Sequence, residues 1–348
     1  MKNRSFFGKI IGLICCILLL RTPKARAEEL VFFTHEHGDS LTRTLKALPE
    51  EAGDVLIRID APLAQDEDAY LMTLRYRSLK SLRIEADLPV HADDILEFYA
   101  WGIPLTVGAG IDLRECSIYG GGFASEGEEL TFESTYVRLE GSAGFVFGGG
   151  FAENGGSIRV NQAVVETGPE SVVYYEVFGG GYAHGTGSLS ETERSMVNCS
   201  GESDYVLGGG FAEEGGRSLS GTAAVSLASE STVHIALFGG CSAAGEESYA
   251  EIRSTEVLLQ GYARWTFGGD FAYNGGSTET KEVQMVTIGT DGRTDSVYMG
   301  SFASAEGSDA LVNTSELHIE GAAADKAAYC LATDGASCKT RHTADFSH

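Results

Sequence analysis

Basic residues, proline and long hydrophobic runs are scarce in this sequence. Its 348 residues include 25 Lys and Arg against 50 Asp and Glu, a formal charge of −25. This balance excludes nucleic acid and anionic membranes as expected partners, because both attract basic proteins. Only 6 prolines stand beside 43% hydrophobic residues, which excludes a collagen-like chain and a disordered linker. The sequence has no phosphate-binding loop, nucleophile elbow or dinucleotide fingerprint.

The longest hydrophobic run, 10–20, is too short to span a bilayer, which takes about 20 residues. Basic residues precede it and Ala25-Arg26-Ala27 follows, so 1–27 is predicted to be a secretory signal peptide. An uncleaved anchor is the alternative. Without 1–27 the chain has 19 basic and 50 acidic residues, a net charge of −31. We therefore expect a secreted protein, extracellular or at the cell surface, with no stable membrane insertion after cleavage.

Five of the 7 cysteines follow the predicted signal peptide. Export makes disulfides permissible, and Cys330 and Cys338 are the best pair. Cys199 and Cys241 stand where other repeats carry Leu and Gly, so we expect them to be small buried residues. No cysteine spacing resembles a zinc site.

Glycine, in contrast, is abundant and periodic, at 45 residues. Glycine strings flanked by large apolar residues and ending in Ala recur seven times, at 119–124, 147–152, 178–183, 207–212, 238–243, 267–272 and 299–303. The alanines that close these strings recur with a period of roughly 30 residues. Internal repeats of this length determine the architecture.

A second motif separates the glycine strings. Apolar and polar residues alternate and end in Gly or Ser at 137–141, 164–168, 197–201, 225–229, 257–261, 285–289 and 317–321. This pattern is typical of a strand that ends in a turn. Roughly 30 residues cannot bury a core alone, but stacked repeats can. We therefore predict an all-β fold, a β-solenoid of about seven repeats, with the flanking aromatics as two interior ladders. The glycines would serve a corner that needs positive φ or close backbone approach.

The connecting arms, which run from the end of the second motif to the start of the next glycine string, alternate in length. The arms after 137–141, 197–201 and 257–261 are short, and those after 164–168, 225–229 and 285–289 are longer. Either every second coil carries a longer loop, or the unit is a pair of repeats. Short arms such as 140–144 also fit hairpin turns. Antiparallel hairpin stacks therefore remain an alternative to one coil per repeat.

Residues 28–105 are predicted to form an N-terminal cap and the first coils. Strands are expected at Leu30–Phe33, Val55–Ile59, Leu82–Ile84, Leu105–Val107 and Ile111–Leu113. Asp39 or Ser40 can cap a helix over 40–48 whose leucines share one face, and this helix would protect the exposed sheet end. The Gly-rich solenoid then covers 106–322, and 323–348 is expected to be a polar C-terminal tail.

The helix at 40–48, the strand DVLIRIDAP, the phrase PLTVGAGIDL and the stacked repeats resemble the right-handed parallel β-helix superfamily typified by pectate lyases. The resemblance covers about residues 40–322, although the repeats here are longer than the usual coil. The Gly-Gly-Gly strings resemble those of secreted, adhesin-like proteins of gut-type bacteria. These resemblances imply a right-handed parallel β-helix that either binds a ligand at a bacterial surface or cleaves a polysaccharide.

His35, His37 and Asp39 resemble the His-x-His-x-Asp-His metal motif of metallo-β-lactamase-type hydrolases. Ser40 stands where the last His of that motif belongs, and repeats follow in place of that fold. These three residues are therefore predicted only as an adventitious metal site.

Acidic and aromatic residues near the glycine strings are the other candidates. Glu153 and Glu213 recur two repeats apart after the Phe-Ala step, Glu214 follows, and Asp270 replaces a glycine. Tyr273, among several tyrosines, could stack on a sugar. We predict these five as ligand-binding residues; a solvated acidic surface is the alternative. Weak Ca²⁺ binding is the only cofactor considered, and the Gly-Gly-x-Gly-x-Asp calcium repeat is absent.

These features favour a non-catalytic, adhesin-like solenoid that presents repeated side chains to an extended ligand, an extracellular glycan or a host protein. The alternative is a polysaccharide lyase or hydrolase of pectate-lyase-like architecture, and a second alternative is a structural spacer. Three carboxylates and a Lys or Arg in one groove would favour the enzyme. The ligand and the oligomeric state do not follow from the sequence.

Overall fold

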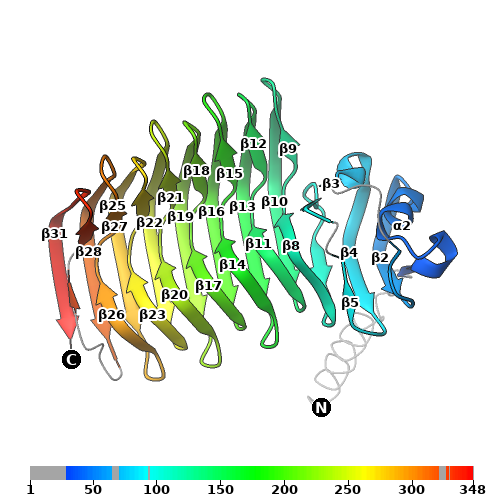
Figure 1. Cartoon of the computed structure of the whole chain (residues 1–348). Helices are drawn as coiled ribbons and strands as arrows, with labels where there is room; N and C mark the ends of the chain where they lie inside the picture. Colours follow the sequence, from blue (N-terminus) through cyan, green and yellow to red (C-terminus); the bar gives the residue numbers. More distant parts are fainter. Residues whose placement is uncertain (1–28, 65–69, 93–94, 321–326, 329, 348) are drawn as a thin grey trace, which may run out of the picture.

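The computed structural model describes residues 29–64, 70–92, 95–320, 327–328 and 330–347. The predicted signal peptide, 1–27, lies outside this range. The described chain is a parallel β-solenoid of about ten turns, and Figure 1 shows its coils stacked from the N-terminal to the C-terminal end. The strand pairs of the Gly-rich coils are all parallel. One coil per repeat is therefore confirmed, and the hairpin alternative is excluded.

Each coil of the Gly-rich region contributes one strand to each of three sheets, here named A, B and C. Sheet A consists of β1 (Leu30–Phe33), β2 (Glu51–Ile59), β4 (Ser78–Ala86), β7 (Leu105–Val107), β10 (Glu129–Leu139), β13 (Ser157–Thr167), β16 (Leu189–Cys199), β19 (Arg217–Leu227), β22 (Tyr249–Leu259), β25 (Ser277–Ile288), β28 (Asp309–Ile319) and β31 (Ser337–Ser347). Sheet B consists of β3 (Tyr70–Leu71), β6 (Glu97–Tyr99), β8 (Ile111–Tyr119), β11 (Ser142–Phe147), β14 (Val172–Phe178), β17 (Glu202–Leu207), β20 (Thr232–Phe238), β23 (Tyr262–Phe267), β26 (Arg293–Tyr298) and β29 (Ala327–Ala328), with β5 (Val90–His91) beside β8. Sheet C consists of β9 (Phe123–Ala124), β12 (Phe151–Glu153), β15 (Tyr182–His184), β18 (Phe211–Glu213), β21 (Ser242–Ala244), β24 (Phe271–Tyr273), β27 (Phe302–Ser304) and β30 (Leu331–Thr333).

The aromatic residues beside the glycine strings form stacked ladders, but these ladders lie on the outer side of sheets B and C and not in the interior of the solenoid. Val146 and Ala152 are fully buried in the interior. Side chains alternate along a strand, so Phe147 and Phe151 point outward, into the corner between sheets B and C. The Phe147 ring stacks on Phe178 with 4.7 Å between centroids and on Tyr182 at 5.8 Å. This corrects the prediction of interior ladders: the rings are buried largely by one another.

The glycine strings serve close backbone approach. None of their glycines has a positive φ. A Cβ at Gly179 would lie only 2.2 Å from the carbonyl oxygen of Gly208 on the next coil. Across the interior, a hydroxyl donates to the first-glycine carbonyl at 2.6 Å in every second coil, in the pairs Thr135–Gly148, Ser195–Gly208 and Thr255–Gly268. The corresponding residues of the coils between them are Ala163 and Ala223. The sequence thus repeats over two coils at this position, while the geometry repeats over one.

The N-terminal end carries the expected helix, α2 (Leu41–Ala47), together with the 3-10 turns η1 (Thr34–His37) and η2 (Thr73–Tyr76). The Ser40 hydroxyl caps α2 by accepting the Arg43 backbone N–H at 3.1 Å. Leu41 and Leu45 are buried against the first coils, and Figure 1 shows α2 covering that end of the stack. No helix of the described residues is long and apolar enough to cross a membrane.

The expected polar tail at the C-terminus is corrected. Strand β31 pairs with β28 from Ser337 to Ser347, so these residues form a further coil. Pairing to an existing sheet edge satisfies the backbone whatever the side-chain polarity. Cys330 and Cys338 form the predicted disulfide within this coil. Cys116, Cys199 and Cys241 are free and buried, as predicted for the last two.

Candidate functional site

A cavity of about 430 Å³ opens on the outer side of the solenoid, along the corner between sheets B and C. Its walls contain eight aromatic residues, three carboxylates and one serine. We name it the aromatic groove, lined by Ser117, Tyr119, Phe145, Phe147, Tyr175, Glu176, Tyr182, Asp204, Tyr205, Phe211, Glu213 and Tyr273. Its volume lies within the usual range of ligand sites, roughly 300–1,000 Å³.

The groove coincides with an interruption of the aromatic ladders. Leu207 stands in register where neighbouring coils carry Phe178 and Phe238. One coil further, Ser242 replaces the aromatic of the second ladder beside Phe211. The short side chain of Ala244 separates Glu213 from Tyr273 in the register of sheet C, and the Tyr273 ring reaches within 6.4 Å of Phe211. The small side chains of Ser242 and Ala244 thus interrupt the second ladder at this coil.

The three carboxylates of the groove lack compensating positive charge. No Lys or Arg lines the cavity. Glu213 accepts a hydrogen bond from the Tyr182 hydroxyl at 2.5 Å. Within the described part of the chain, the carboxylates of Glu176 and Asp204 have no hydrogen-bond or ion-pair partner. Burial, followed by the charges of Glu213 and Asp204, raises the pKa of Glu176 to about 7.

The register of sheet C places Glu153, His184 and Glu213 in one column on successive coils. Of the residues predicted from the sequence, Glu213 and Tyr273 line the aromatic groove, and Glu153 lies in the same column outside its lining. Glu214 occupies a turn with φ 50°, and its carboxylate lies 3.2 Å from His184 Nε2. The structure therefore brings two of the five predicted residues together.

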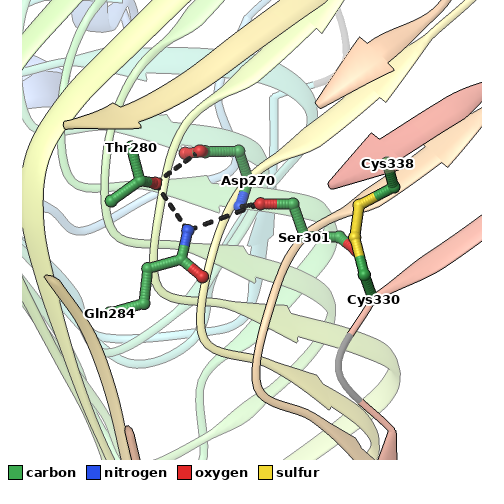
Figure 2. The surroundings of a disulfide bond; sticks show 6 residues. All are labelled: Asp270, Thr280, Gln284, Ser301, Cys330 and Cys338. Atoms are coloured by element: carbon green, nitrogen blue, oxygen red, sulfur yellow. Dashed lines mark hydrogen bonds between the residues drawn. A yellow bond between two sulfur atoms is a disulfide. The ribbon is translucent and has the colours of Figure 1, made fainter. Parts of the chain in front are cut away.

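Asp270 lies inside the solenoid, with no exposed surface. One carboxylate oxygen accepts the Cys241 backbone N–H at 2.8 Å, and the other accepts the Thr280 hydroxyl at 2.7 Å. Figure 2 shows this interior cluster with Gln284 and Ser301, close to the Cys330–Cys338 disulfide. Asp270 thus fills the space of the third glycine of its string and is not presented to an external ligand. Burial raises the pKa of its carboxyl to about 6.

The predicted metal residues do not form a metal site. In η1, the His35 ring is paired with Asp60, and the His37 ring packs toward Phe32 at 6.4 Å between centroids. Asp39 follows in a left-handed turn, with φ 56°. Over the described ranges, no group of three His, Cys, Asp or Glu residues is close enough to hold a metal ion. This corrects the prediction for His35, His37 and Asp39 and gives no support to a Ca²⁺ site.

Sequence reasoning missed Glu176, Asp204 and Tyr205. Glu176 and Tyr205 stand two residues before the ladder residue of their coils, in register with Phe145. Residues two apart on a strand share a face, so this column lies beside the outer ladder. Placing the ladders on the outer face would have identified these positions.

A larger hollow, about 830 Å³, lies on sheet A and is bordered by Arg194, Glu256, Lys281 and Glu282 among others. Lys281 is already paired with Glu279 at 2.6 Å and Glu251 at 3.3 Å. No aromatic residue lines this hollow and its lysine is already paired, so the aromatic groove is the stronger candidate for a ligand site.

No protein-family model, curated protein or solved structure matches the chain. The fold and the groove are therefore the observations from which function can be argued.

Proposed function

We propose that this chain is a secreted, adhesin-like, non-catalytic binding protein whose aromatic groove holds an extended glycan. The observation that carries the proposal is the set of eight aromatic side chains beside three carboxylates, with no basic residue, in one elongated cavity. Aromatic faces pack against the apolar faces of sugar rings, and carboxylates accept hydrogen bonds from hydroxyl groups.

The direction of the groove supports an extended ligand. Its residues run from Tyr119 to Tyr273, across five steps between stacked coils. At about 4.8 Å per step, this is roughly 24 Å along the solenoid axis. A rigid stack holds these side chains in place before binding, which lowers the entropic cost of ordering the site.

Tyr175 and Tyr205 allow a direct test. Both line the groove, and Tyr175 is 44% exposed, so replacing either by Ala should spare the fold. On a glycan that an array identifies, we expect each variant to bind roughly 2- to 10-fold more weakly, the usual contribution of an aromatic contact. Tyr76→Ala is the matched control, since Tyr76 is 80% exposed and does not line the groove. Unchanged affinity in both groove variants would contradict the proposal, and absence of any bound glycan would favour a structural spacer.

A hydrolase is the second candidate, because Glu176 and Glu213 both border the groove. A carboxyl with a pKa of about 7 is suited to general-acid catalysis. The lyase is less well supported, since no Lys or Arg lines the cavity to take a proton. Incubation with the bound glycan separates the candidates. New reducing ends that Glu176→Gln abolishes would establish hydrolysis, whereas binding without shortened or unsaturated products would support the non-catalytic proposal.

A further inference from the structure

We propose that the ligand of the aromatic groove is a saccharide with free amino groups, bound through its ammonium groups. This inference rests on the proposed function, since it names the class of glycan that the same groove accepts.

The titratable groups that line the groove are all carboxyls or tyrosine hydroxyls. Glu176, Asp204 and Glu213 line it without a basic residue, and Glu176, whose pKa is about 7 in the empty groove, ionises more readily when an ammonium group binds beside it. Arg114 on β8 is engaged elsewhere, donating to the Tyr174 hydroxyl at 2.9 Å and to Asp112 at 3.2 Å. Charge that is uncompensated in the empty site must be compensated by solvent or by a ligand. Uronates and sulfated sugars would add like charge to this groove and are disfavoured.

The aromatic walls favour a cation as well. Tyr175 lines the same cavity as the carboxylates, has one ring face stacked on Phe145 at 4.9 Å between centroids, and is 44% exposed. An ammonium over an aromatic ring face is attracted by the electrons of the ring, and more strongly when it is desolvated. Rings and carboxylates together therefore select an organic cation over a fully hydrated metal ion, in keeping with the absence of a close carboxylate cluster among the described residues.

A sugar ring would fill the part of the groove that an ammonium group leaves free. The groove is elongated and contains more ring surface than one ammonium can cover. The Tyr182 hydroxyl is already used by Glu213, so that carboxylate has a fixed orientation and keeps lone pairs for ligand N–H or O–H groups. A chain of amino sugars supplies apolar ring faces, hydroxyls and a regular series of ammonium groups.

The experiment compares two hexamers with the same β-1,4-linked backbone, one of glucosamine and one of N-acetylglucosamine, by calorimetry at about pH 6. We expect the glucosamine hexamer to bind at least about tenfold more tightly. The double variant Glu176→Gln, Asp204→Asn should remove most of that difference. Glu170→Gln, which removes an exposed carboxylate outside the groove, should leave it unchanged.

The outcomes separate this inference from the proposed function. Equal or tighter binding of the acetylated hexamer would overturn the amino-sugar inference and leave a glycan-binding groove. Binding of hexalysine as tight as that of the glucosamine hexamer would also overturn it, because charge alone would then suffice. Failure of both hexamers, with binding of another glycan weakened by Tyr205→Ala, would refute only the inference. Failure of every glycan would refute the proposed function too.

Discussion

Replacing Asp270 by Asn should make the free energy of unfolding less dependent on pH. The carboxyl of Asp270 is fully buried, and its pKa is about 6, against 3.8 for the unperturbed group. Burial is the largest cause, partly offset by hydrogen bonds from the Thr280 hydroxyl and the Cys241 N–H. Asn has the same shape, still accepts from Cys241, and can donate to the Thr280 oxygen.

The direction in which the free energy of unfolding changes with pH follows from proton binding. Between pH 3.8 and about 6 the folded state holds a proton on Asp270 that the unfolded state has released, so stability falls as pH rises. The contribution is fully present below pH 3.8 and lost above about pH 6. A shift of about 2 pKa units at 1.36 kcal/mol each gives a loss of about 3 kcal/mol.

Urea unfolding between about pH 3 and pH 7.5 measures this difference. Other carboxyls also titrate in this range, so the informative quantity is the free energy of unfolding of the variant minus that of the wild type. We expect it to increase by about 3 kcal/mol across the range. Asp309→Asn is the control, because Asp309 is exposed on β28, and its difference should stay flat. A flat profile for Asp270→Asn as well would show that the buried carboxyl is ionised at little cost, and the reasoning would be wrong.

Three further perturbations test the fold. Gly179→Ala places a Cβ 2.2 Å from a backbone oxygen of the next coil, so it should lower the free energy of unfolding in urea by roughly 1–3 kcal/mol. Gly53→Ala is the control, because a Cβ there has no atom within 4 Å, and it should leave that free energy unchanged. Ser40→Ala removes the N-cap of α2 and should cost about 1 kcal/mol, measured in the same way; no change would show that the cap bond is dispensable. Cys330→Ser opens the Cys330–Cys338 link and should speed proteolysis of the last coil, so equal cleavage rates would mean that strand pairing alone holds it.

The coil geometry could be read from the repeats, since a short, regular period with alternating strands leaves few ways to bury apolar side chains. Cys330 and Cys338 were paired from proximity alone, and residue type narrowed the helix cap to Asp39 or Ser40, of which the structure selects Ser40. The outward direction of Phe147 and Phe151 was missed because the aromatic residues would repeat at the same spacing whether they pointed to the interior of the solenoid or to its outside. Glu176 and Tyr205 were missed for the same reason, since their significance depends on which face the ladders occupy, and Asp204 lies at a break in the register of β17 that the sequence pattern does not show.

The sequence by itself determined that the chain stacks repeats of strands with a helix at one end, because periodicity and glycine spacing are local properties, whereas the parallel pairing of the strands came from the structure. Only the tertiary structure decided which carboxylates meet. Asp270 replaces the third glycine of a string and Glu213 follows a string, and the first lies in the solenoid interior while the second lines the aromatic groove. The surroundings of Glu213 depend on the register between coils and on the small side chains of Ser242 and Ala244, and no single repeat contains this information.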